Sequence, residues 1–230
     1  MKIGIIGAMS VETDALKAQI QDAKSETVSG IEFVSGKLYG KDIVVAQCGI
    51  GKVFAAICAQ TMIIRFRVDK IINTGVAGTL CDELGILDIA IATDVVQHDM
   101  DTSALGDLVG LISGINIVKI SADTSLANKI AKAAEAVGVK CVKGVIASGD
   151  QFINNKERKN FIRTSFDAIA CEMEGAAIGH VCFVNGVDFA VIRAISDNAS
   201  GEADIEYPEM VRRAAAQSAA IIKKLLEAQA

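Results

Sequence analysis

Short runs of β-branched and other apolar residues alternate along this chain with longer segments of helical periodicity. This alternation predicts an α/β protein in which helices cover both faces of a mostly central sheet. Because segment 30–40 has the pattern of a local antiparallel hairpin, we expect the sheet to be mixed. The predicted strands are residues 2–9, 31–38, 42–48, 70–74, 86–97, 140–148, 168–173 and 188–196. The predicted helices are residues 11–22, 53–66, 125–137, 155–164, 175–184 and 209–228.

The chain has no obvious internal boundary. Pro208 is its only proline, and no Gly/Ser-rich stretch or repeat divides its 230 residues. Hydrophobic residues make up 51% of the sequence, which is typical of a globular chain and excludes a disordered one. We therefore expect a single domain over residues 1–230.

The net charge of the chain and the length of its apolar runs indicate whether it binds nucleic acid or a membrane. The formal net charge of −5 disfavours non-specific binding to the phosphates of nucleic acids. No apolar run reaches the ~18–20 residues of a membrane-spanning helix. The apolar run at the N-terminus is interrupted by Glu12 and Asp14, too early for a secretory signal. We expect a cytoplasmic protein whose partner is neither nucleic acid nor membrane.

Six cysteines lie at uneven spacings without a C-x-x-C pair. Only His98 and His180 could join them as nitrogen ligands, so a zinc site is not indicated. Free cysteine packs as a small hydrophobic side chain, and we expect unpaired thiols in a reducing compartment.

Acidic residues and glycines follow the predicted strands, where α/β folds bind their ligands. Glu12 follows the first strand, and Glu172 and Glu174, two positions apart, can share one strand face at the end of the seventh. Asp197 follows the last. Each acid could instead cap a helix, and the glycines at 49–51 and 75–78 could serve turn geometry alone. No dinucleotide fingerprint or P-loop is present. These residues permit a metal-free acid/base site without identifying its substrate.

Six motifs, in order along essentially the whole chain, carry a more specific resemblance. They are IGIIGAM-x-x-E at 3–12, GIGKV at 49–53, IINTG-x-AG at 71–78, SGD-x-FIN at 148–154, EME-x-AAI-x-HVC at 172–182 and RAISD at 193–197. Together they resemble the 5′-methylthioadenosine/S-adenosylhomocysteine nucleosidases of the nucleoside phosphorylase family. The resemblance implies a three-layer αβα sandwich with a mixed central sheet, a homodimer, a small-molecule nucleoside substrate, and no metal or organic cofactor.

The resemblance also implies roles in the reaction. Asp197 matches the general acid that protonates N7 of adenine, with Ser196 orienting it. Glu12 matches the residue that holds and activates the attacking water. Protonating the base makes adenine a better leaving group, and carboxylates near the sugar stabilise its developing positive charge. Unlike most sugar hydrolases, such a site needs no covalent carboxylate nucleophile.

The remaining site residues are implied as substrate contacts. Glu172, Met173 and Glu174 correspond to the ribose-binding segment, and Met9 lies beneath the sugar. Adenine is surrounded by Ala77, Gly78, Phe152 and Ile153. Phe152 stacks on the base, and the backbone of Ile153 binds its Watson–Crick edge. The 5′-thio substituent is bordered by Ile50 and Tyr207.

Two other functions remain open. A phosphorylase would use phosphate in place of water, and its site should present cationic groups to the anion. Glu12 would repel phosphate and Arg193 alone cannot clamp it, so hydrolysis is favoured. A protein that only binds nucleosides is the second alternative, but binding alone does not need three carboxylates.

Two departures from the family pattern concern substrate preference. Val76 stands where many members have serine. Residues 99–116 match poorly and contain no aromatic residue, although in the family this region covers the neighbouring subunit's 5′-alkylthio group. The preferred 5′ substituent therefore stays open among methylthioadenosine, S-adenosylhomocysteine, 5′-deoxyadenosine and aminodeoxyfutalosine.

Overall fold

The computed structural model describes residues 1–197 and 207–228, without the side chains of Asp197 and Tyr207. Within these residues the strands are β1 (Lys2–Gly7), β2 (Gln21–Val28), β3 (Ile31–Leu38), β4 (Lys41–Gln47), β5 (Lys70–Thr79), β6 (Ile89–Gln97), β7 (Ile120–Ser121), β8 (Cys141–Ser148), β9 (Ala168–Glu172) and β10 (Asp188–Asp197). The helices are α1 (Ser10–Lys17), α2 (Lys52–Ile64), α3 (Thr124–Ala136), α4 (Lys156–Phe166), α5 (Gly175–Asn185) and α6 (Tyr207–Glu227), with a short 3₁₀ turn at Ser103–Leu105. In these residues no helix is long and apolar enough to cross a membrane.

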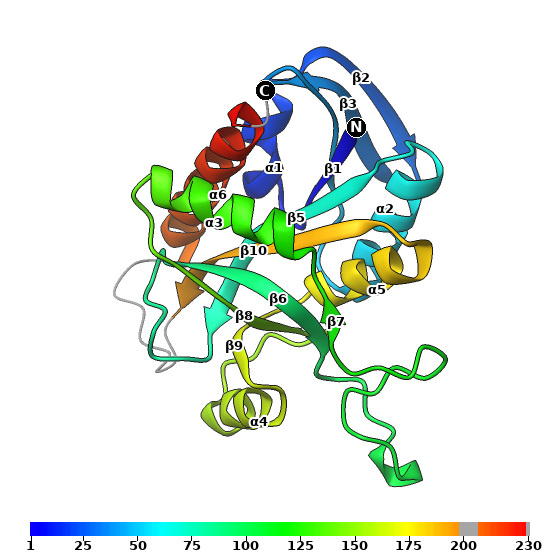
Figure 1. Ribbon diagram of the computed structural model, residues 1–230, viewed down its shortest axis with the longest axis vertical. Coiled ribbons are helices and arrows are strands. Elements are labelled where there is room, and N and C mark those ends of the chain that lie inside the picture. The colour runs from blue at the N-terminus through cyan, green and yellow to red at the C-terminus, as the bar shows by residue number, and fades with distance from the viewer. Residues whose placement is uncertain (198–206, 229–230) are drawn as a thin grey trace.

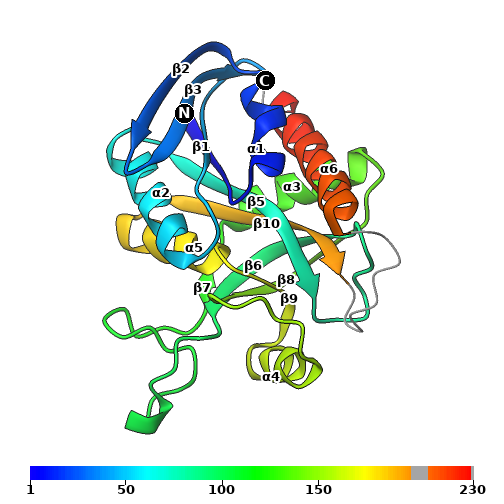
Figure 2. The ribbon, with the colours of Figure 1, turned by 180° about the vertical axis from the view of Figure 1, so that it is seen from behind.

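One mixed sheet organises the fold. Its strand order is β10-β6-β8-β9-β5-β1-β4-β3-β2, and β10 also pairs with β5, which closes one end of the sheet on itself. Helices α1, α3 and α6 pack together on one face, and α2 and α5 pack together on the other (Figures 1 and 2). The predicted three-layer αβα sandwich with a mixed sheet is therefore confirmed.

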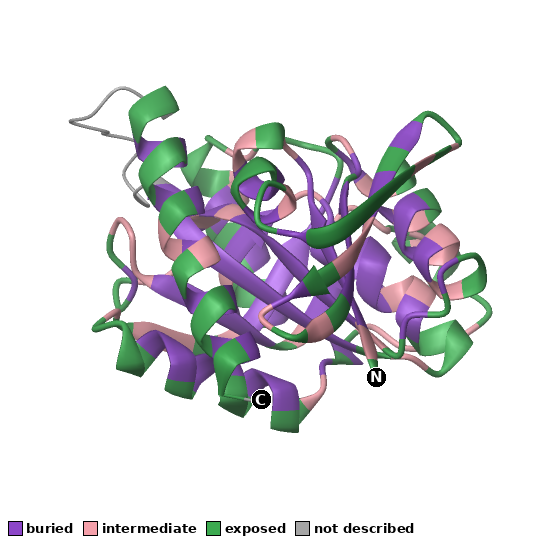
Figure 3. Cartoon of the chain, turned by 90° about the horizontal axis from the view of Figure 1, so that it is seen from above, coloured by how far each residue is buried: buried purple, intermediate pink, exposed green. Residues whose placement is uncertain are grey.

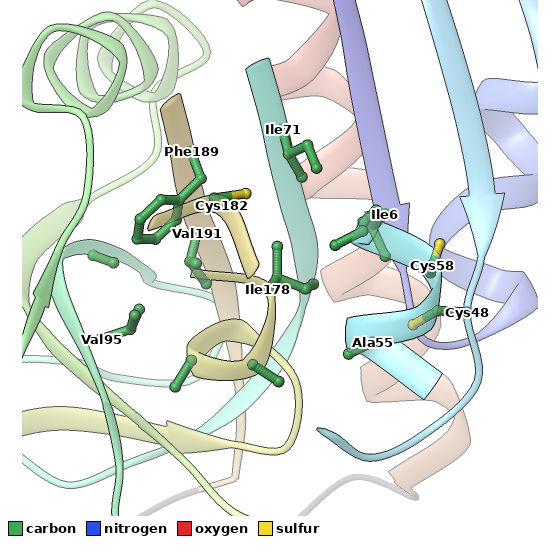
Figure 4. Packing of buried hydrophobic residues seen from close by; sticks show 14 of the residues in the cluster. Ile6, Cys48, Ala55, Cys58, Ile71, Val95, Ile178, Cys182, Phe189 and Val191 are labelled. Atoms are coloured by element: carbon green, nitrogen blue, oxygen red, sulfur yellow. The ribbon is translucent and has the colours of Figure 1, made fainter. Parts of the chain in front are cut away.

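The apolar strands are buried on both faces, as their continuous apolar runs predict. Along β1, Ile5 packs in the cluster that α1, α3 and α6 cover, and its neighbour Ile6 packs in the cluster beneath α2 and α5. Figure 4 shows part of the second cluster, which includes Ile178 of α5 and Val191 of β10. Figure 3 shows the buried central strands between helices that expose only their outer faces. Each fully buried aliphatic side chain contributes roughly 1.5–3 kcal/mol to folding.

The element boundaries differ from prediction mainly near the N-terminus. Helix α1 ends at Lys17, so the predicted helix 11–22 is too long, and residues 21–28 form the unpredicted strand β2. β2 lies at the sheet edge and is mostly exposed, so its sequence lacks the apolar alternation of a half-buried strand. β5 continues beyond the predicted strand 70–74 to Thr79, because residues 75–79 pair with β10 and β9.

The strand pairing gathers the candidate residues at one end of the sheet. Four neighbouring strands run parallel to one another, in the order β4, β1, β5 and β10. Their carboxyl ends therefore lie at the same edge of the sheet. β8 runs parallel to β9, which places Ser148 beside Glu172. β9 then crosses the end of β5 with Cys171 opposite Gly78. Segments far apart in sequence therefore meet around a single cavity.

Candidate active site

A cavity of about 130 Å³ opens at this end of the sheet. Its walls come from the segments that follow β1, β4, β8 and β9 and from the ends of β5, β9 and β10, with Ile50 and Phe152 mostly exposed at its margin. The lining residues are Ala8, Met9, Glu12, Ile50, Val76, Ala77, Gly78, Phe152, Cys171, Glu172, Met173, Glu174 and Ser196. Most of the residues expected at the site are thus brought together.

Glu12 lies in the first turn of α1 and is buried. Its Oε2 accepts hydrogen bonds from the backbone N–H of Ala8 at 2.7 Å and of Met9 at 2.9 Å. Burial raises the pKa of Glu12, although these N–H groups and the charge of Arg193 act in the opposite direction. The glycine at 75 makes room for this carboxylate, because a Cβ there would lie 2.9 Å from Glu12 Oε1. Glu12 is therefore held by the backbone at the cavity wall.

Arg193 of β10 provides the positive charge behind the acids and is 1% exposed. Its Nη2 donates to Glu172 and to Asn73, and it lies 3.8 Å from Glu174 Oε2. Sequence reasoning placed Arg193 nearby but missed this role. A lone arginine within the apolar run of residues 189–195 was the available signal, because a buried cation needs anionic partners.

Glu172 is engaged by protein donors. Besides Arg193, its carboxylate accepts from Ser148 Oγ, from the Glu174 N–H at 3.0 Å and from the Gly175 N–H at 2.8 Å. The helix-capping alternative therefore describes part of what Glu172 does, because these N–H groups open α5. Glu172 lines the cavity and at the same time organises Arg193 and the start of α5.

Glu174 reaches in a different direction. Its Oε1 accepts the backbone N–H of Gly51 at 2.9 Å, across the cavity from the turn between β4 and α2. Burial and then the charge of Glu172 raise the pKa of Glu174 to about 7, although Arg193 and the Gly51 N–H favour the charged form. Glu174 can therefore change protonation state near neutral pH.

The apolar residues Phe152 and Met173 line the cavity together with Val76 and Ala77 of β5. Ser196 Oγ donates to the Ala77 carbonyl at 3.4 Å. Ile153 does not line the main cavity but lines an adjoining hollow of about 40 Å³, which shares Gly78, Phe152 and Met173 with it. The hollow also includes Lys159 of α4, a buried lysine that the sequence analysis did not single out.

Two expected residues fall partly outside the described structure. The backbone of Asp197 pairs with Gly78, which places residue 197 beside the cavity wall, but its side chain is not described. Tyr207 begins α6, and its side chain is likewise outside the described residues.

The charge of the site disfavours an anionic co-substrate. Among the described residues that line the cavity, the charged ones are Glu12, Glu172 and Glu174, and none is Lys or Arg. Arg193 lies behind the cavity and is paired with Glu172. Such a wall stabilises positive charge on a bound molecule and repels phosphate.

Comparison with known proteins places this architecture in a class. The family model described as the phosphorylase superfamily matches residues 2–227. A curated protein of Shewanella sediminis, named 5′-methylthioadenosine/S-adenosylhomocysteine nucleosidase, is 43% identical over 229 residues, 99% of each chain. The chain therefore belongs to the 5′-methylthioadenosine/S-adenosylhomocysteine nucleosidases of the phosphorylase superfamily.

Two solved structures are similarly close. The nucleosidase of Colwellia psychrerythraea 34H, solved in complex with adenine, is 38% identical with a TM-score of 0.92, over 98% of this chain and 94% of that one. A protein of Helicobacter pylori strain 26695 described as futalosine hydrolase is also 38% identical with a TM-score of 0.92, over 99% and 98% of the two chains. The family expected from the six motifs is confirmed.

Proposed function

We propose that this chain hydrolyses the N-glycosidic bond of 5′-methylthioadenosine, S-adenosylhomocysteine and related 5′-substituted adenosines. The products are adenine and the 5-thioribose. The observation that carries the proposal is the buried Glu12 carboxylate, which two backbone N–H groups fix at the wall of a cavity lined by acids. The names of the relatives support the same reaction.

On the base side, Asp197 is the proposed general acid. It delivers a proton to N7 of adenine as the bond to the sugar lengthens, and the electrons of that bond leave with the neutral base. Ser196 orients the acid. Phe152 stacks on adenine, the Ile153 backbone reads its Watson–Crick edge, and the backbone at Ala77 and Gly78 closes the slot, consistent with the apolar wall there.

On the sugar side, Glu12 holds the water. Its Oε2 already accepts two N–H groups, and we assign Oε1 to the water that attacks the anomeric carbon. Glu174 and the Met173 backbone bind the ribose hydroxyls, with Met9 beneath the ring. The negative wall stabilises the oxocarbenium-like sugar in the transition state. Glu172 supports this arrangement through Arg193 and α5 rather than by taking a substrate hydrogen bond of its own.

The 5′ end of the substrate lies toward Ile50 and Tyr207 in this proposal. Ile50 is 58% exposed, so this margin is open to substituents larger than a methylthio group. The futalosine hydrolase relative makes a 5′-extended nucleoside such as aminodeoxyfutalosine a second substrate candidate.

Adenine release from the purified protein tests the reaction. We expect release from methylthioadenosine without phosphate, and loss of most activity in Asp197→Asn. Release only in the presence of phosphate would assign a phosphorylase. Tight binding without release would assign a nucleoside-binding protein.

The working form is proposed to be a cytoplasmic homodimer built from this one domain. All six cysteines are free, which suits a reducing compartment. Exposed apolar side chains lie on two helices that pack together, with Val53 and Phe54 on α2 and Phe183 and Val184 on α5. Surface patches of this kind mark interfaces. Sedimentation equilibrium that gives the mass of one chain at micromolar concentration would exclude the dimer.

A further inference from the structure

An ion pair outside the cavity joins three segments that carry the proposed site. Lys52 Nζ contacts Asp99 Oδ1 at 2.6 Å, and Asp99 Oδ2 accepts the Asp150 N–H at 2.9 Å. Asp150 Oδ1 in turn accepts the backbone N–H of Lys52 at 2.7 Å. These contacts close a ring, and we call Lys52, Asp99 and Asp150 the loop clamp. None of the three lines the cavity.

The loop clamp fixes the start of α2. Gly51 is the N-cap residue of this helix and has no side chain to satisfy the first N–H groups. The carboxylate of Asp150 caps the helix from another segment, and the carboxylate of Glu174 takes the preceding N–H, from Gly51. Two consecutive backbone N–H groups therefore bind the two carboxylates: that of Gly51 binds Glu174, and that of Lys52 binds Asp150 of the clamp.

The same ring fixes the segment that leads to Phe152. Asp150 lies two residues before Phe152, and both its N–H and its carboxylate are bound within the clamp. Asp99 follows β6 at the root of the arm that extends from the body in Figures 1 and 2. Lys52 Nζ also donates to Gln97 Oε1 at 3.2 Å, which ties α2 to the end of β6.

The ion pair of the clamp is partly sheltered from solvent, whereas Asp150 is exposed. The side chains of Lys52 and Asp99 are 19% and 16% exposed. Burial acts to raise the pKa of Asp99, but the Lys52 ammonium and the Asp150 N–H outweigh it, so the pKa lies below its usual value. Charge-assisted hydrogen bonds are shorter and stronger than neutral ones, and a closed ring holds each partner in one geometry.

We propose that Lys52 and Asp99 are positioning residues, which hold the Gly51 N–H against Glu174 and the Phe152 segment against the cavity. Substrate affinity then depends on an ion pair that touches no substrate. This inference rests on the proposed function for the roles of Glu174 and Phe152. Small misplacements of binding groups are costly, since about 1 Å can reduce a rate about 10²-fold.

The variants Asp99→Asn, Lys52→Met and their double mutant test the inference. Asparagine keeps one acceptor oxygen at position 99, so it cannot serve both the Lys52 ammonium and the Asp150 N–H. Lys52→Arg keeps the charge and should recover most of the loss seen in Lys52→Met. The matched control is Asp188→Asn, which breaks a 2.7 Å ion pair with Lys70 at the amino ends of β10 and β5, far from the cavity.

Three measurements decide whether Lys52 and Asp99 are positioning residues. Adenine affinity, measured by calorimetry, should weaken roughly 10-fold or more in each single variant, and KM for methylthioadenosine should rise more than kcat falls. The double mutant should lose clearly less than the two single losses combined, because the two residues share one ion pair. In the ligand-free protein, hydrogen exchange at the Gly51 amide should accelerate in Asp99→Asn but not in Asp188→Asn.

The outcomes separate the two claims. If the unsubstituted protein releases no adenine, the proposed function fails, while the exchange rate of Gly51 still tests the clamp. If both single variants keep adenine affinity, KM and Gly51 exchange within twofold of the unsubstituted protein and lose only thermal stability, the clamp is structural and the inference is overturned.

Discussion

The backbone N–H of Gly51 donates to Oε1 of Glu174 at 2.9 Å, although 123 positions separate the two residues. The bond crosses from the N-cap of α2 to the residue before α5 and fixes the orientation of a buried carboxylate. That carboxylate also lies 3.8 Å from Arg193. The surroundings of the Glu174 carboxylate should therefore affect how readily it binds a proton, and this can be measured.

The first prediction concerns stability and pH at Glu174. Burial and then the charge of Glu172 raise its pKa from 4.5 to about 7, so the folded protein binds a proton that the unfolded chain has released. Between pH 4.5 and 7 this contribution to the free energy of unfolding falls as pH rises, by about 3 kcal/mol in all. Glu174→Gln should lack that decline. Urea unfolding at pH 5 and pH 8 measures it, and equal pH dependence in both proteins would contradict the assignment.

Glu12→Gln separates catalysis from folding. Glutamine can still accept from the backbone at Ala8 but cannot take a proton from water. We expect kcat for methylthioadenosine to fall by about 10²–10⁴-fold. Because burial raises the pKa of Glu12, replacing the carboxylate should not lower the thermal midpoint. Loss of activity together with a large loss of stability would instead indicate a purely structural residue.

Arg193→Met tests the charge behind the cavity. The substitution leaves Glu172 without its buried cation and removes the nearby positive charge from Glu174 and Glu12. Removing one partner of a buried ion pair typically costs about 3–5 kcal/mol of unfolding free energy. Urea unfolding at pH 8 should show this loss, with a smaller one at pH 5, where Glu174 is already protonated. A loss below ~1 kcal/mol at both pH values would exclude the role that the geometry gives Arg193.

The sequence predicts most of the fold because the buried strands have clear apolar runs. It fails at β2, whose residues 21–28 pair only with β3 at an exposed edge and carry little apolar signal. In the site, the rule that ligands bind at strand ends brought Glu12, Glu174 and Ala77 together correctly. The Arg193–Glu172 pair and the loop clamp could not be predicted in the same way. Both depend on which distant segments become neighbours, and strand order fixes that only after folding.

Gly75→Ala offers a subtler perturbation of Glu12. A Cβ at position 75 would lie 2.9 Å from Glu12 Oε1 and 3.5 Å from the Arg193 guanidinium carbon. Residue 75 is in β5 and has no positive φ, so alanine meets no backbone strain there and the conflict is with the carboxylate. Oε1 is also the oxygen assigned to the attacking water.

We therefore expect Gly75→Ala to lower kcat by 10-fold or more, because misplacement of a catalytic group by a fraction of an ångström is enough to slow the reaction. Adenine affinity and the urea midpoint should change little. Gly30→Ala, at an exposed turn where a Cβ meets no atom within 4 Å but φ is +77°, is the control for backbone effects alone. It should lower stability without changing kcat. If Gly75→Ala keeps full kcat, the space beside Oε1 is not needed for the reaction, and the water must be held from another side of the cavity.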